Sequence, residues 1–224
     1  MKMSSYAFAI MILLIIAAIA FPYFTKSFVY NRVYNAVKKK DYDLALKRLN
    51  EKIYATLFGK YDRDLMILRV YINSQNYKAA ETHVMEVLTS SNLSSSQSYQ
   101  IASMAFYIFV DIGYADACKF LLPYMNRKKT QEEYEFASCL YRVFIEKKSD
   151  DIEANLACIE KIQNDPKKKE DPTQQIGLYQ YLIGLQYMYK KKYTEAKKYL
   201  RKAKTNLKGT PYHKRINGLI ASCK

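Results

Sequence analysis

The pattern of hydrophobic and polar positions divides the chain into one long apolar run and a series of shorter amphipathic segments. From Tyr6 to Phe24 there is no charged residue. A helix of this length spans about 28 Å, close to the hydrocarbon core of a bilayer at about 30 Å. We therefore expect a transmembrane anchor over residues 6–24, preceded by a short tail over 1–5.

The end of the apolar run leaves a second interpretation open. The sequence AIA at 18–20 fits the small-x-small rule for cleavage of a signal sequence after Ala20. The residues that follow, FPYF at 21–24, extend the apolar run instead of ending it, and their rings suit a membrane interface. These residues favour a retained anchor. Cleavage after Ala20, which would release an extracytoplasmic protein, is the alternative.

The charges on either side of the run predict its orientation. Lys2 and the α-amine precede it, whereas five basic residues follow within about 16 residues, the range over which the positive-inside rule counts charge. The five are Lys26, Arg32, Lys38, Lys39 and Lys40. We expect a single-pass protein of the cell membrane whose larger part, 28–224, is cytoplasmic in preference to extracytoplasmic.

Residues 28–224 show helical spacing of apolar residues with few glycines, which predicts an all-α fold. Four of the tyrosines that precede an alanine by three positions recur in phase, and a degenerate copy at 150–154 has Asp150 and Glu153, which can serve as a capping box. With that copy, the pattern recurs about every 35–41 residues. The four clear pairs are Tyr42/Ala45, Tyr77/Ala80, Tyr114/Ala117 and Tyr193/Ala196. The first helix of the first unit is expected over Phe28–Val37, separated from the anchor by a kink at Pro22.

The segment YQYLIGLQYMYKKKYTEAKKYLRKAKT at 179–205 resembles the tetratricopeptide repeat, a helix-turn-helix of about 34 residues. The residues that carry the resemblance are Ile183, Gly184, Tyr187, Ala196, Leu200 and Ala203. Gln180 and Pro211 depart from the family pattern. The resemblance, to the membrane-anchored bacterial type, implies a right-handed α-solenoid of about five repeats in which Gly184 and Ala196 let two helices cross closely.

In this family the first helices of the repeats line an inner surface that binds peptides. Transferred to this chain, that groove would comprise Leu65, Arg69, Tyr99, Phe106, Tyr181, Leu185 and Met188. Packing between adjacent helices is the alternative role for several of them. The resemblance thus implies an adaptor or scaffold that presents a groove to subunits of an envelope, secretion or quality-control complex.

The net charge of +15 and a pI of about 9.5 favour anionic partners, although an A/T-biased coding sequence would also produce a lysine-rich chain. Lys38, Lys39 and Lys40 follow the anchor closely enough to contact anionic lipid. Further clusters at 127–129, 147–148, 167–169 and 190–192 fall in expected turns and loops, where exposed lysine is also ordinary. No base-reading element is recognisable, which argues against a nucleic-acid binder.

The sequence carries no signal for catalysis or for a cofactor. It has no phosphate-binding glycine loop, no nucleophile elbow and no spaced set of metal ligands. The four cysteines, Cys118, Cys139, Cys158 and Cys223, are far apart and lie among apolar neighbours, so we expect them to be small core residues. We therefore expect a non-catalytic protein without a cofactor.

Overall fold

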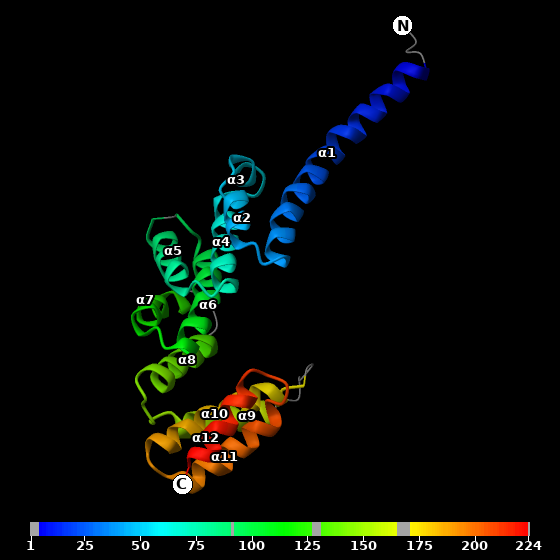
Figure 1. Ribbon diagram of the computed structural model, residues 1–224. Coiled ribbons are helices and arrows are strands. Elements are labelled where there is room, and N and C mark those ends of the chain that lie inside the picture. Colours follow the sequence, from blue (N-terminus) through cyan, green and yellow to red (C-terminus); the bar gives the residue numbers. More distant parts are fainter. Residues whose placement is uncertain (1–4, 91, 127–130, 165–170, 224) are drawn as a thin grey trace. The chain divides into compact units, whose positions relative to one another are not determined.

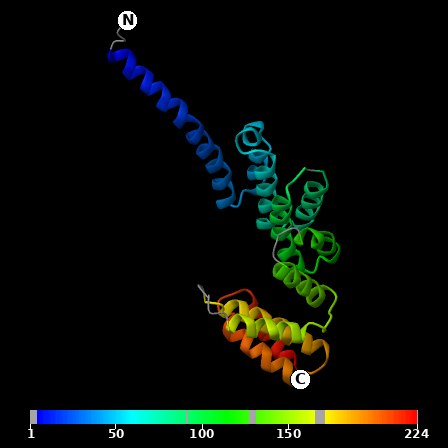
Figure 2. The same ribbon diagram turned by 180° about the vertical axis from the view of Figure 1, so that it is seen from behind.

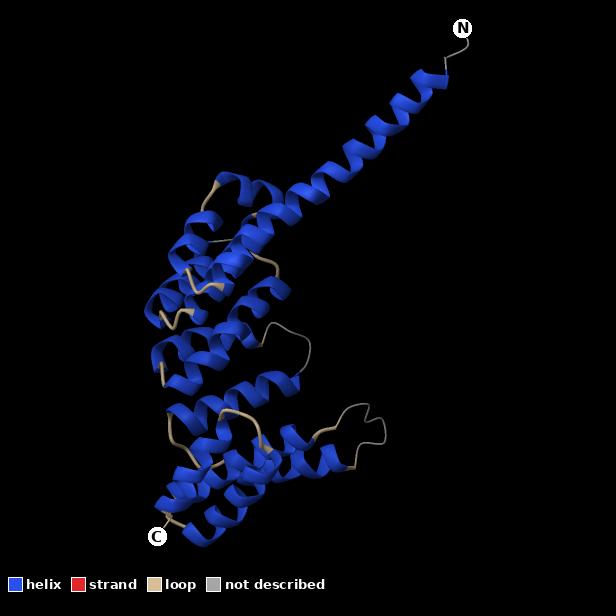
Figure 3. Cartoon of the chain, turned by 45° about the vertical axis from the view of Figure 1, so that its right-hand side comes forward, coloured by secondary structure: helices blue, strands red, loops and turns tan. Residues whose placement is uncertain are grey.

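The computed structural model describes residues 5–90, 92–126, 131–164 and 171–223, with side chains from residue 20 onward. Over this part of the chain the regular structure is helical and contains no strand (Figure 3), which confirms the all-α prediction. The contacts divide the chain into a first unit, 1–105, and a second unit, 106–224, and the boundary falls inside helix α6.

The described part of the first unit contains five helices and the beginning of a sixth (Figure 1). They are α1 (Ser5–Lys38), α2 (Tyr42–Leu49), α3 (Lys52–Phe58), α4 (Lys60–Asn73), α5 (Tyr77–Ser90) and α6 (Ser95–Ile112). In this unit α1 packs against α2 and α3, α2 against α4, and α4 against α5. The first part of α1 extends beyond the other helices of the unit (Figures 1 and 2).

Helix α1 runs without interruption through Pro22, where the sequence predicted a kink between two segments. Pro22 lies inside one continuous helix, so the expected anchor and the expected first repeat helix form a single element. A proline removes one backbone hydrogen bond and crowds the preceding turn. Here the apolar run on one side and the packed segment from Val29 on the other both favour helix, and the helical assignment continues through the proline.

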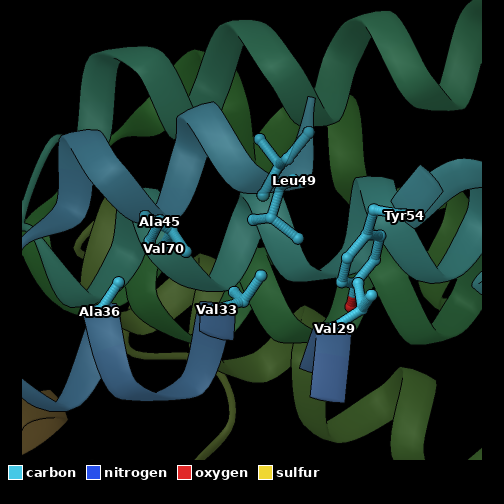
Figure 4. Packing of buried hydrophobic residues seen from close by; sticks show 8 residues of the cluster. Val29, Val33, Ala36, Ala45, Leu49, Tyr54 and Val70 are labelled. Atoms are coloured by element: carbon cyan, nitrogen blue, oxygen red, sulfur yellow. The ribbon is translucent and has the colours of Figure 1, made fainter. Parts of the chain in front are cut away.

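A buried cluster fixes the second half of α1 to its unit (Figure 4). Its members come from α1, α2, α3 and α4: Val29, Val33, Ala36, Ala45, Leu49, Tyr54, Ile67 and Val70. The guanidinium of Arg32 on α1 donates two hydrogen bonds to the carboxylate of Glu51, at 3.2 and 3.3 Å. Helix α3, which the periodicity did not predict, supplies Tyr54 to this cluster.

Where the structure describes it, the second unit continues α6 and adds seven further helical segments. They are α7 (Ala115–Met125), α8 (Gln131–Leu140), the π-helix η1 (Tyr141–Ile145), α9 (Ile152–Gln163), α10 (Thr173–Tyr189), α11 (Tyr193–Asn206) and α12 (Tyr212–Ser222). Helix α10 packs against α9, α11 and η1, and α11 packs against α12. Because α10 is covered on several sides, it is apolar around most of its circumference, unlike the amphipathic α11.

The recurring tyrosines mark the second helix of each pair. Helices α2, α5 and α11 begin at Tyr42, Tyr77 and Tyr193, and α7 begins directly after Tyr114. The alanines three residues after these tyrosines are fully buried: Ala45, Ala80, Ala117 and Ala196. The degenerate copy also precedes a helix, since α9 begins at Ile152. A helix therefore begins at each of the five places where the pattern recurs, and α1 with α2, α4 with α5 and α10 with α11 pack as pairs.

Four of the turns between consecutive helices share one backbone conformation and hydrogen bond. Each has a residue with positive φ: Lys40 (60°), Gln75 (59°), Gly113 (82°) and Lys191 (58°). The amide after it donates to the carbonyl five residues back, as from Asp41 to Ala36 and from Lys192 to Tyr187. This is the Schellman arrangement, which satisfies carbonyls at the end of the first helix and normally carries glycine at the left-handed position.

Replacing Lys191 with glycine is expected to raise the free energy of unfolding of the second unit by about 0.5–1 kcal/mol, because a left-handed L-residue is strained and glycine is not. The same change at Lys190, where φ is −77°, is expected to lower it. Hydrogen exchange of the α10 and α11 amides in the full chain would measure both. A loss of protection in the Lys191 variant would contradict this explanation of the turn.

Candidate membrane and partner surfaces

Six large aromatic side chains are exposed within a short stretch of α1. They are Phe21, Tyr23, Phe24, Phe28, Tyr30 and Tyr34, and the three phenylalanines are 65–74% exposed. At helical spacing the phenylalanines share one face and the tyrosines share another, on either side of the buried stripe that starts at Val29. Aromatic surface of this extent is unusual on a soluble monomer and indicates a surface that meets a membrane or a partner.

The exposed rings adjoin the apolar run but are held by a well-packed segment. Val33 and Ala36 are buried beneath them along the helix, and the Arg32 backbone carbonyl accepts a hydrogen bond from Arg48 of α2. Tyr30 and Tyr34 stack on each other with ring centroids 6.3 Å apart. The aromatic surface is therefore presented by a helix anchored at one end in the first unit.

The expected anchor falls largely on residues that the structure does not describe in full. The side chains of residues 6–19, and the whole of residues 1–4, lie outside the described part. Among the residues whose side chains the structure describes, no helix is long and apolar enough to cross a membrane.

Lys38, Lys39 and Lys40 are all exposed at the end of α1. Because α1 is continuous, Lys38 lies about 21 Å along the helix axis from Phe24. That distance exceeds two Debye lengths at physiological ionic strength, so an upright helix would hold the three lysines farther from lipid head groups than the sequence suggested. The expected clusters at 127–129 and 167–169 lie outside the described residues.

The seven expected groove residues have different environments. In the first unit Leu65 is buried, Tyr99 is half-buried, and Arg69 is exposed with its guanidinium 3.8 Å from the sulfur of Met66. In the second unit Phe106, Tyr181 and Leu185 are buried and Met188 is half-buried. The ring of Tyr181 has Phe144 and Tyr212 as neighbours, at 5.9 and 5.5 Å between centroids. The buried members serve the core, as the alternative interpretation supposed, and the accessible ones are Arg69, Tyr99 and Met188.

A partly buried polar network in the second unit was missed by sequence reasoning. Arg142 of η1 donates to both carboxylate oxygens of Asp151, at 2.6 and 2.9 Å. The Asp151 amide donates to the fully buried Gln186 of α10 at 2.8 Å. The predicted capping box is wrong in detail: Asp151, not Asp150, is the N-cap of α9, and its carboxylate holds Arg142 instead of capping the helix. The sequence carries one signal of this network, because Gln186 is a polar residue inside a largely apolar helix.

The cysteines behave as core residues. Cys118, Cys139 and Cys223 are buried and Cys158 is half-buried. Burial raises the pKa of the Cys118 thiol to about 12 and that of Cys139 to about 11, so neither is a ready thiolate nucleophile at neutral pH. Among the described residues, no three His, Cys, Asp or Glu side chains are placed to hold a metal ion.

The remaining repeat-defining residues lie where two helices cross. Gly184 and Ala203 are buried between α10 and α11, and Tyr187 stacks on Tyr199 of α11 with centroids 5.7 Å apart. A methyl group built on Gly184 would lie 2.7 Å from two side-chain atoms of Leu200. These contacts explain why a small residue is needed at this position.

Comparison of the chain with protein-family models, with curated proteins and with solved structures finds no match. The resemblance to the tetratricopeptide repeat therefore rests on the residues quoted for it.

Proposed function

We propose that the protein is a membrane-anchored adaptor built from tetratricopeptide-like helix pairs. A single transmembrane pass over 6–24 would hold it in the cell membrane, and the helices of 28–224 would recruit a protein partner, such as a subunit of an envelope, secretion or quality-control complex. One observation carries the proposal most: the exposed aromatic side chains at 21–28 lie at the end of an uncharged apolar run and just beyond it. An interfacial position would cover these rings.

Further support comes from the helix pairs. Their buried small residues and recurring tyrosines agree with the resemblance, which implies protein binding and no catalysis. The groove remains a proposal, and Arg69, Tyr99 and Met188 are its accessible members. Lys38–Lys40 would contact anionic lipid if α1 tilts toward the bilayer.

Membrane attachment is tested by alkaline extraction of membranes from bacteria that express the full chain. We expect the protein to stay in the membrane pellet. Substituting both Leu13 and Leu14 with arginine is expected to release it, because charges at the centre of a spanning helix are costly. Substituting both with isoleucine is the matched control. Release of the unmodified chain by alkali would contradict the anchor.

The mass of the mature protein and its protease accessibility separate the alternatives. A chain that starts at Phe21 would favour the extracytoplasmic protein formed by cleavage after Ala20. An uncut chain whose helices resist protease added to intact cells agrees with the cytoplasmic orientation. Degradation from outside would reverse that orientation without removing the anchor.

A further inference from the structure

The outward surface of α11 is densely cationic. Ala196, Leu200 and Ala203 are fully buried and turn one side of this helix toward the core. The other side, together with Lys208 in the turn that follows Asn206, forms what we name the α11 cationic face: Lys197, Lys198, Arg201, Lys202, Lys204 and Lys208. Glu195 is the only acidic residue in α11. The face is therefore almost free of negative charge along the length of the helix.

The positive charge of the cationic face is not neutralised by carboxylates within the described part of the chain. Among the described residues none of its six cations forms an ion pair, whereas Arg142 and Arg215 elsewhere in the same unit pair with Asp151 and Asp111. Two of its pairs within α11, Lys197/Arg201 and Lys198/Lys202, are four residues apart, a spacing at which like charges destabilise a helix. An anionic partner would relieve this repulsion, so the face is better suited to a bound state than to isolation.

The composition of the face indicates what kind of anion it fits. Five of the six cations are lysines, which act as hydrated point charges, whereas arginine is preferred for paired hydrogen bonds to a defined carboxylate or phosphate. The ring of Tyr199, between Lys198 and Lys202 in sequence, is not open for stacking a base. Tyr199 lies against Tyr187 at 5.7 Å, and the ammonium groups of Lys198 and Lys202 are 6.0 and 5.7 Å from its centroid.

We infer that the α11 cationic face binds the surface of an anionic membrane through lipid head groups. The apolar side of α11 is buried in the protein, so the helix contacts the surface by charge alone and does not insert. This goes beyond the proposed function, because the attraction requires neither the transmembrane pass nor the peptide groove. It gives the surplus positive charge of the second unit a role.

The test uses the full chain reconstituted in vesicles of phosphatidylcholine alone or of a phosphatidylserine-rich mixture. A water-soluble lysine-reactive ester labels the protein, and mass spectrometry gives the rate at each lysine. We expect Lys197, Lys204 and Lys208 to be labelled at least about fivefold more slowly in the anionic vesicles, and high salt to remove the difference. Lys47 and Lys119, exposed on α2 and α7, should be labelled equally in both.

Two matched variants each remove three positive charges, one from the α11 cationic face and the other from exposed sites outside α11. The triple substitution K198Q/R201Q/K202Q is expected to weaken the association by on the order of a hundredfold, at about fivefold per charge, and so to abolish protection of the remaining face. The triple K47Q/K52Q/K119Q removes the same charge from exposed sites outside α11 and should retain protection. Glutamine keeps the helix propensity of lysine and arginine.

The outcomes separate this inference from the proposed function. Equal labelling of α11 in both kinds of vesicle would overturn the inference, even if the chain stays anchored. Failure to associate with phosphatidylcholine vesicles would contradict the anchor, and charge-dependent protection in anionic vesicles would still support the inference. Protection produced by added polyglutamate or RNA, but not by phosphatidylserine, would overturn it in favour of an acidic polypeptide or nucleic acid.

Discussion

Replacing Tyr54 with alanine is expected to lower the free energy of unfolding of the first unit by about 3–5 kcal/mol. The side chain is 1% exposed and belongs to the cluster that joins α1, α2, α3 and α4. Its ring also stacks on Phe58 with centroids 4.6 Å apart. Removing it leaves a cavity beside Val29 and Val33, the residues that hold α1 to its unit, so the loss should reach α1 as well as α3.

Hydrogen exchange of the full chain measures this effect locally, which matters because a chain of two units has no single unfolding free energy. Amides of α2, α3 and the segment after Val29 should lose protection, and those of α10 and α11 should not. Tyr54→Phe is the matched control, because it keeps the ring and should change stability by less than about 1.5 kcal/mol. Equal protection in the alanine variant and the unmodified protein would show that α3 does not hold α1.

Tyr54 also illustrates why the sequence predicted only part of the first unit. The tyrosine-alanine pairs are local signals, and each is read from a turn and the first residues of a helix. Helix α3 is seven residues long, too short to show a period, and its tyrosine is buried only because α1 and α4 lie against it. Its role therefore depends on contacts between segments distant in the sequence.

The dependence on contacts between distant segments also explains why the sequence predicted the candidate surfaces only in part. Spacing identified the helices that carry Phe106 and Tyr181, but the burial of these rings depends on which helices cover them. The bond from the Asp151 amide to Gln186 joins residues 35 positions apart, and no local pattern predicts it. The cationic face of α11 was readable as charge in the sequence. Its outward position and its lack of ion pairs required the structure.

Replacing Gly184 with alanine is expected to lower the free energy of unfolding of the second unit by about 1–3 kcal/mol, because it overpacks the crossing of α10 and α11. The added methyl group would meet the Cγ and Cδ2 atoms of Leu200 at 2.7 Å and the Leu200 amide nitrogen at 3.3 Å. Leu200 is fully buried and its Cγ lies close to the backbone, so the conflict cannot be relieved by moving a flexible side-chain end. Hydrogen exchange of α10 and α11 amides measures the loss.

Gly218 supplies the control, because it lies inside α12 with no atom within 4 Å of an added methyl group. Gly218→Ala should raise helix stability by about 0.5–1 kcal/mol, the usual gain when alanine replaces glycine in a helix. The same change from glycine to alanine is thus expected to lower stability at position 184 and to raise it at position 218. Combining Gly184→Ala with Leu200→Ala, which removes the opposing atoms, should cost less than the sum of the two single changes. Additive losses would mean that Gly184 matters for a reason other than this contact.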